Sequence, residues 1–295
     1  MWGVPIVLLS IATACVGAMG DDQPVMTAAD LGDLPHPAAD RRLRYGDAPS
    51  QFGELRLPPP PGPHPVVIVI HGGCWLAEYG LDYMSAFSDA LAAAGAATWS
   101  IEYRRVGDEG GGWPGTFVDV GRAADHLREI APEYDLDLDR VAAVGHSAGG
   151  HLALWLAGRA GLERDDPLRG SLPIRLSGVV TQAGIPDLAS YASPDGCGSA
   201  VPGLLGGDPP FPLQLLRRSS PVEMLPLGVD TTLVIGDRDT IVPSSQARSF
   251  ADAARRMGET VVVTEIAGAG HFELVDPSHP GFGVIREAIF GILAR

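Results

Sequence analysis

The stretch that decides the fold is VAAVGHSAGGHLALWLA, residues 141–157. It begins with a short apolar run at residues 141–144 that is typical of a buried strand. It continues through GHSAG, residues 145–149, into a segment whose apolar residues have helical spacing. A serine on a tight turn between a strand and a helix lies at a helix N-terminus, where developing negative charge is favoured. The stretch therefore predicts a strand, a sharp turn and a helix, with Ser147 as a nucleophile.

A succession of expected strands and helices extends along the chain from residue 65 onward. Short β-branched apolar runs alternate with longer amphipathic stretches, which is typical of β-α-β units and of a mainly parallel sheet with helices on both faces. The expected strands are residues 66–70, 97–103, 141–145, 176–183, 232–235 and 261–266, and the expected helices are residues 83–94, 116–130, 148–159, 244–257 and 285–293. Residues 41–45 and 52–57 are candidates for an antiparallel edge pair. The fold class is therefore α/β.

Length and composition favour one large domain. The chain has 295 residues and 45% hydrophobic content, so we expect a single α/β domain over residues 21–295. Residues 184–227 have no clear periodicity and many Pro and Gly residues, which indicates a small cap or pocket loop. The net charge of -15 comes without a basic cluster, which argues against nucleic acid or an anionic membrane surface as a partner. A neutral or cationic small molecule fits better.

The N-terminal segment is expected to direct export. Residues 1–20 form an uncharged apolar run followed by small residues, too short for a spanning helix, and they are interpreted as a signal peptide. The protein would then be periplasmic or secreted, with lipid attachment at Cys15 as a variant of this reading and a cytoplasmic location if the segment is no signal. In an oxidising compartment, Cys74 and Cys197 could form a disulfide, and free thiols are the alternative.

A glycine-rich loop follows the expected strand 66–70. Its sequence is HGGCW, residues 71–75, at a position from which backbone N–H groups can bind an oxyanion. The candidate donors in this loop are Gly72, Gly73 and Cys74, with Gly73 or Cys74 expected to act together with Ala148. The alternative is a plain glycine turn beside a buried tryptophan. We expect His71 to support the loop by hydrogen bonds and not to act as a base.

A serine nucleophile needs a base and an acid that orients the base. Of the eight histidines, His271 is our choice because it lies in a loop directly after the last strong strand, in GAGHF, residues 268–272. The loop GDRDTIVP, residues 236–243, follows the strand before it and offers Asp237 and Asp239. The chain order serine, aspartate, histidine is then complete, but the residues alone do not separate the two aspartates. Asp237 could be a turn or capping residue.

With those pieces placed, the chain resembles the esterase and lipase branch of the α/β-hydrolase superfamily. Within it, the likeness is to small carboxylesterases and arylformamidases with a His-Gly-Gly-x-Trp motif. It rests on HGGCW at 71–75, YRR at 103–105, GHSAGGH at 145–151 and GH at 270–271, and it extends from about residue 41 to the C-terminus. The resemblance implies that the triad acid is Asp239, the first residue of Asp-x-x-Val-Pro. It also implies that Trp113 and Asp187 border the substrate pocket, and we expect Trp75 and His146 there as well.

The expected reaction is hydrolysis of small, short-chain carboxylic esters through an acyl-enzyme. An alternative substrate is an N-formyl arylamine of the N-formylkynurenine type, because the resembling group contains both activities. A reading of another class is a catalytically silent hydrolase-fold binding protein. No metal and no organic cofactor are expected, since no His, Cys and carboxylate cluster has ligand spacing.

Overall fold

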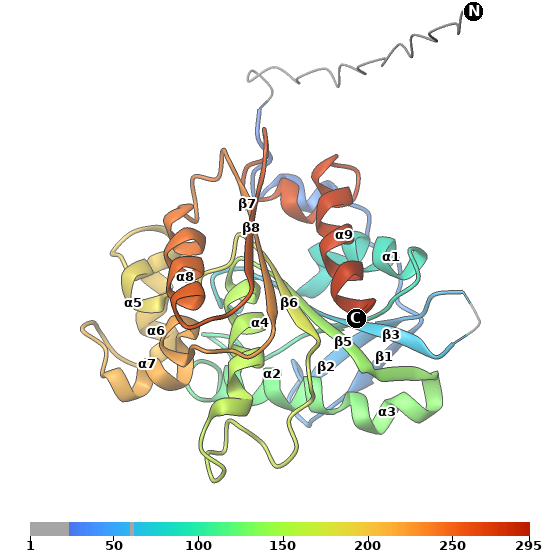
Figure 1. Ribbon diagram of the computed structural model, residues 1–295, viewed down its shortest axis with the longest axis horizontal. Coiled ribbons are helices and arrows are strands. Elements are labelled where there is room, and N and C mark those ends of the chain that lie inside the picture. The colour runs from blue at the N-terminus through green and yellow to red at the C-terminus, as the bar shows by residue number, and fades with distance from the viewer. Residues whose placement is uncertain (1–23, 60–61) are drawn as a thin grey trace, which may run out of the picture.

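The computed structural model describes residues 24–59 and 62–295, so the expected signal segment 1–20 with Cys15 lies outside it (Figure 1). Within the described residues, one eight-stranded sheet has the order β1-β2-β4-β3-β5-β6-β7-β8. The strands are β1 (Arg41–Arg44), β2 (Phe52–Arg56), β3 (His64–Ile70), β4 (Ala97–Ile101), β5 (Leu136–His146), β6 (Gly178–Gln182), β7 (Asp230–Gly236) and β8 (Val261–Ile266). The pairs β1–β2 and β2–β4 are antiparallel, and every later pair is parallel. The expected antiparallel edge and parallel sheet are both present.

Helices cover both faces of the sheet (Figure 1). On one face lie α1 (Ser85–Ala93) and α9 (Gly281–Leu293), and on the other lie α4 (Ala148–Gly158) and α8 (Ser245–Arg256). Next to α4 is α2 (Gly115–Asp125), followed by α3 (Leu127–Tyr134) against β5. Because both faces are covered, the central strands carry long buried stretches, and six of the seven residues of β3 are buried. The α/β prediction is confirmed.

The expected helix over residues 116–130 is wrong as a single element. It breaks at His126, between α2 and α3, and α3 then extends to Tyr134. The indole Nε1 of Trp99 donates to the carbonyl oxygen of Ala123 at 2.8 Å. In a continuous helix the N–H of Leu127 would use that carbonyl, so a tertiary hydrogen bond competes with the helical one at the break.

The cap segment, residues 184–227, folds into short helices. They are α5 (Leu188–Tyr191), α6 (Val201–Leu205) and α7 (Leu213–Ser219), with the 3₁₀ turns η4 (Gly196–Ala200) and η5 (Pro221–Met224). Four further 3₁₀ turns lie elsewhere in the described chain: η1 (Asp30–Asp33), η2 (Leu81–Met84), η3 (Arg159–Gly161) and η6 (Glu273–Val275). Among the helices of residues 24–59 and 62–295, none has the length and apolar content needed to cross a membrane. The parallel strands end at one edge of the sheet, and the loops there carry the candidate site.

Candidate active site

Ser147 lies on the turn that joins β5 to α4. Its backbone has φ 55° and ψ -120°, a strained conformation for a residue with a side chain. Its N–H donates to the carbonyl oxygen of Gln182 at 2.7 Å, which fixes the turn against the end of β6. A Cβ atom at Gly145 would lie 2.1 Å from the Gly149 carbonyl oxygen, and one at Gly149 would lie 2.1 Å from that of Ile70. Only glycine fits at both positions, which explains the spacing of the motif.

His271 and Asp239 form a buried pair. The Nδ1 of His271 donates to Oδ2 of Asp239 at 2.7 Å, and the two side chains are 5% and 3% exposed. The other carboxylate oxygen, Oδ1, accepts from the backbone N–H groups of Ile241 at 2.7 Å and Val242 at 3.0 Å. These three bonds hold the carboxylate and leave Nε2 of the imidazole directed to other partners.

The second candidate acid has a different place. Asp237 accepts from the N–H of Gly268 at 2.8 Å, so it joins the loop after β7 to the turn after β8. Its role is that of a turn residue, the alternative considered from the sequence. The geometry therefore separates the two aspartates, and Asp239 is the one that contacts the histidine.

The loop at residues 71–75 has an unusual backbone. Gly73, Cys74 and Trp75 have φ values of 95°, 52° and 58°, so three consecutive residues are in the left-handed region. Among the described residues, no hydrogen-bond acceptor is found for the N–H groups of Gly73 and Cys74. By contrast, the N–H of Gly72 donates to Oη of Tyr83 at 2.5 Å, so this donor is already used. Ala148 is the first residue of α4, where an N–H has no partner within the helix.

A chain of hydrogen bonds connects this loop to the histidine. Tyr83 Oη, which accepts from Gly72, lies 2.9 Å from Nδ1 of His146, and Nε2 of His146 lies 3.1 Å from the carbonyl oxygen of His271. Burial, reinforced by the charge of His271, holds the pKa of His146 well below its ordinary value. The neutral ring must therefore carry its proton on Nε2 and accept from Tyr83 at Nδ1. His146 thus links the loop at residues 71–75, through Tyr83, to the backbone of His271.

His71 supports the loop at residues 71–75 through its own side chain. Its Nδ1 lies 2.8 Å from the carbonyl oxygen of Gly72, and its Nε2 lies 2.9 Å from Oε1 of Glu102. The ring stacks on Tyr103 with centroids 4.4 Å apart. Burial acts to raise the pKa of Glu102, but the attraction of His71 and Arg105 outweighs it and keeps that pKa below its ordinary value. This supporting arrangement is what the sequence led us to expect of His71.

A cavity of about 610 Å³ contains the reactive groups. Ser147, His271 and His146 line it, together with Gly73 and Cys74 of the loop. The remaining wall is mostly apolar and comes from Ala28, Leu31, Tyr79, Tyr83, Ser190, Tyr191, Ser193, Asp195, Gly196, Cys197, Gly198, Thr240, Ile241, Pro243 and Phe272. Burial, with the nearby charge of Asp239 as a second cause, raises the pKa of Tyr191 to about 12, so its hydroxyl stays protonated near neutral pH.

Three of the four residues expected at the substrate pocket lie outside this cavity wall. Trp75 is fully buried, and its indole donates to Nδ1 of His151 at 3.1 Å. Trp113 packs against Phe117 with ring centroids 5.3 Å apart. Asp187 accepts from the N–H of Ser190 at 3.1 Å and caps α5. Each side chain is occupied by packing or capping, and only His146 of the four contacts the cavity.

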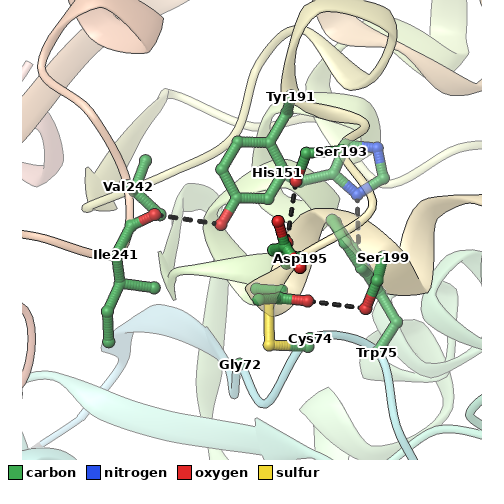
Figure 2. The surroundings of a disulfide bond; sticks show 12 residues. Gly72, Cys74, Trp75, His151, Tyr191, Ser193, Asp195, Ser199, Ile241 and Val242 are labelled. Carbon is green, nitrogen blue, oxygen red and sulfur yellow. Dashed lines mark hydrogen bonds between the residues drawn. A yellow bond between two sulfur atoms is a disulfide. The ribbon is translucent and has the colours of Figure 1, made fainter.

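A disulfide joins two sides of the cavity (Figure 2). Cys74 of the loop at residues 71–75 is bonded to Cys197 of η4, with the Cα atoms 5.2 Å apart. Figure 2 shows Tyr191 close by, with its hydroxyl bonded to the carbonyl of Ile241 at 3.2 Å. Of the cap segment 184–227, residues 190–198 include the ones that reach the cavity. The cap segment and the loop at residues 71–75 are thus joined covalently, by the disulfide that the sequence led us to consider.

Within the described part of the chain, no group of three or more His, Cys, Asp or Glu side chains is placed to hold a metal ion. The cavity wall likewise has no concentration of basic residues. The chemistry available in it comes from a hydroxyl, an imidazole, a carboxylate and backbone N–H groups.

A strained serine between strand and helix, a histidine paired with an aspartate, and a mainly parallel sheet define the α/β-hydrolase fold of the esterase and lipase class. The BD-FAE family model matches residues 55–253, and the chain belongs to this family. It is 31% identical to Esterase LipC of Mycobacterium tuberculosis over 258 residues, which are 82% of this chain and 62% of that protein. It is 27% identical to the probable carboxylic ester hydrolase LipM of the same organism, over 68% of this chain and 47% of that protein. The chain thus spans about half to three fifths of these relatives.

Solved structures share the fold. A carbohydrate esterase from gut microbiota, in truncated form, has a TM-score of 0.75 at 23% identity and covers 88% of this chain and 98% of its own. Esterase B from Lactobacillus rhamnosis has a TM-score of 0.75 at 20% identity and covers 90% of each chain. At these identities the likeness establishes the architecture alone.

Proposed function

We propose that the protein is a serine carboxylesterase that cleaves small esters through an acyl-enzyme, with Ser147, His271 and Asp239 as its triad. The observation that carries the proposal is the bond of 2.7 Å between His271 Nδ1 and Asp239 Oδ2, in a cavity that Ser147 also lines. The names of the mycobacterial relatives, an esterase and a probable carboxylic ester hydrolase, support the same reaction.

The chemistry follows from the pairing of the imidazole. Asp239 fixes the proton of His271 on Nδ1, so Nε2 is free to take the proton of Ser147 Oγ as this oxygen attacks the acyl carbonyl. His271 then gives the proton to the departing alcohol oxygen. In the second half, His271 takes a proton from water, the water oxygen attacks the acyl-enzyme, and the proton returns to Ser147 Oγ. Asp239 remains ionised and stabilises the imidazolium formed in each half.

The negative oxygen that develops at the carbonyl requires donors. We assign them to the N–H groups of Ala148 and of Gly73 or Cys74, since these have no competing acceptor among the described residues. We exclude Gly72, because its N–H is bonded to Tyr83. Each donor of this kind contributes about 10² to 10³ in rate.

The disulfide supports export as part of the proposal. Disulfides persist in oxidising compartments and are rare in the cytosol, and this one joins Cys74 to Cys197. We infer that residues 1–20 direct the protein out of the cytoplasm. Mass spectrometry of the protein recovered from medium, periplasm and cytosol tests this. Recovery of the chain with Met1 in the cytosol alone would contradict it.

The decisive experiment is hydrolysis of p-nitrophenyl acetate and butyrate by the wild type, Ser147→Ala and the control Ser245→Ala. Ser245 is exposed on α8 and away from the cavity. We expect equal rates for wild type and control, and a loss of about 10³-fold or more in kcat for Ser147→Ala. Equal rates for all three proteins would refute the assignment of Ser147. A wild type without turnover of either ester would refute the esterase proposal, and N-formylkynurenine would be the next substrate to assay.

A further inference from the structure

One side of the cavity is built by a segment that precedes the family match. Residues 24–34, here called the N-terminal strap, come before the first residue of the BD-FAE match, residue 55. Two strap residues, Ala28 and Leu31, nevertheless line the cavity that contains Ser147 and His271. The wall at this point is therefore built in part by residues outside the family match.

A buried carboxylate holds the strap against the catalytic loop. Glu273, 7% exposed, accepts from the N–H of Met26 with Oε1 at 2.5 Å and from the N–H of Gly270 with Oε2 at 2.9 Å. Gly270 immediately precedes His271, so one carboxylate joins the strap to the loop of the proposed base. Packing adds to this bond, since a Cβ atom at Gly270 would lie 3.0 Å from the Cβ of Val25.

The strap has a fixed shape beyond this anchor. Asp30 Oδ2 accepts from both the N–H and the hydroxyl of Thr27, at 2.6 and 2.7 Å. The turn that results leads into η1, where Leu31 is 9% exposed and belongs to the hydrophobic core. The strap is therefore held in place and forms part of the cavity wall. Leu31 packs inward, and Ala28 is exposed at the edge of the cavity.

We propose that Ala28 and Leu31 are specificity-determining residues that limit the length of the apolar chain the cavity accepts. This inference rests on the proposed ester hydrolysis. Both residues are aliphatic, and they share the wall with Ile241 and Phe272, so the strap offers an apolar surface to a hydrocarbon chain and no polar group. The chain can belong to the acyl group or to the alcohol of the ester.

The test compares Ala28→Trp with Ala29→Trp as its matched control. Both alanines are exposed neighbours in the strap, but only Ala28 lines the cavity. One arm lengthens the acyl group, from p-nitrophenyl acetate to octanoate, and the other lengthens the alcohol, from ethyl to octyl acetate. In at least one arm, we expect Ala28→Trp to lower kcat/KM for the long ester by about tenfold relative to that for the short ester. The control should keep the wild-type ratio.

The arm that responds identifies which end of the ester faces the strap. Leu31→Ala should change the same ratio in the opposite direction, because it enlarges the cavity. Identical chain-length profiles for Ala28→Trp and Ala29→Trp in both arms would overturn the proposal, whatever the overall rate.

A measurement that needs no reaction keeps this proposal separate from the esterase proposal. Hydrogen exchange should show a protected Met26 amide in the wild type, and faster exchange there in Glu273→Gln, whose amide oxygen cannot replace both carboxylate oxygens. If the strap amides of the wild type exchange as fast as those of an unfolded peptide, the strap does not form a wall of the cavity, and the proposal is overturned even if esters are cleaved. If no ester is cleaved, the esterase proposal fails. Weaker binding of the apolar dye Nile red to Ala28→Trp than to Ala29→Trp would then support the wall, and equal binding would overturn it.

Discussion

Removal of the disulfide between Cys74 and Cys197 should cost the protein much of its stability. The two cysteines are separated by 123 residues, so the bond closes a long loop in the unfolded chain. Loop closure of this length corresponds to a loss of unfolded-state entropy worth about 5 kcal/mol at 25 °C. Relaxation in the native state reduces this figure, and we expect a decrease of about 2 to 5 kcal/mol in the free energy of unfolding. Since domains are stable by about 5 to 15 kcal/mol, the loss is a large fraction.

The assay is urea unfolding of the wild type and of the double variant Cys74→Ser/Cys197→Ser, followed by circular dichroism. The variant should unfold at lower urea and with a larger m value, because its unfolded chain is no longer held compact and exposes more surface. Ser199→Ala is a suitable control, since among the described residues its hydroxyl bonds only within η4, to the carbonyl oxygen of Gly196 at 2.7 Å. Wild type treated with dithiothreitol should match the double variant.

The refuting result is a double variant whose free energy of unfolding is within about 1 kcal/mol of the wild type, with an unchanged m value. The hypothesis that the disulfide stabilises the protein by restricting the unfolded chain would then be wrong. If the loss of stability is found, an increase in KM with little change in kcat would indicate that η4 loosens while the triad stays in place.

Three further changes have expected outcomes. Asp239→Asn should lower kcat for p-nitrophenyl acetate by about 10⁴-fold, because the amide favours the wrong tautomer of His271; a residual rate near wild type would remove Asp239 from the triad. Tyr83→Phe leaves the N–H of Gly72 and Nδ1 of His146 without partners. Urea unfolding should show a loss of about 1 to 3 kcal/mol for each such group, and an unchanged midpoint would contradict the bonding scheme. Acid should destabilise the protein below pH 6.5, the ordinary pKa of histidine, because burial lowers the pKa of His146 well below that value and that of His151 to about 4. The unfolded chain binds protons there that the folded protein does not, so the free energy of unfolding should fall by about 2 kcal/mol between pH 7 and pH 5 on account of His151. His146 adds to this loss, and equal free energies of unfolding at the two pH values would refute the reasoning.

The inner strands of the sheet were predictable because they are buried on both faces, as in β3 and β4. A run such as 66–70 need only be apolar and β-branched to be recognised. The edge strand β8 is partly exposed, but its β-branched residues still gave the predicted limits, 261–266. The helix break at His126 was not predictable from local sequence, because it depends on a hydrogen bond from Trp99 on a neighbouring strand to Ala123. Local pattern therefore defined which elements exist, and tertiary contacts defined where several of them end.

The candidate site divides in the same way. The serine turn, the oxyanion loop and the histidine loop are continuous motifs, so sequence pointed to them directly. The choice between Asp237 and Asp239 required a family resemblance, since both are carboxylates in one loop and only the hydrogen bond to His271 separates them. The strap was missed altogether, because its anchor is the backbone N–H of Met26, a donor that nearly every residue type has.

The bond from Met26 to Glu273 also bears on how the protein is made, since its partners are 247 positions apart in the chain. A ribosome synthesises the strap long before the carboxylate that anchors it, and a domain generally folds as a unit. The cavity can be completed only after Glu273 has been added. The strap, which left the ribosome much earlier, then packs against it. Nascent chains of this protein should therefore lack a finished cavity around Ser147 until synthesis is nearly over.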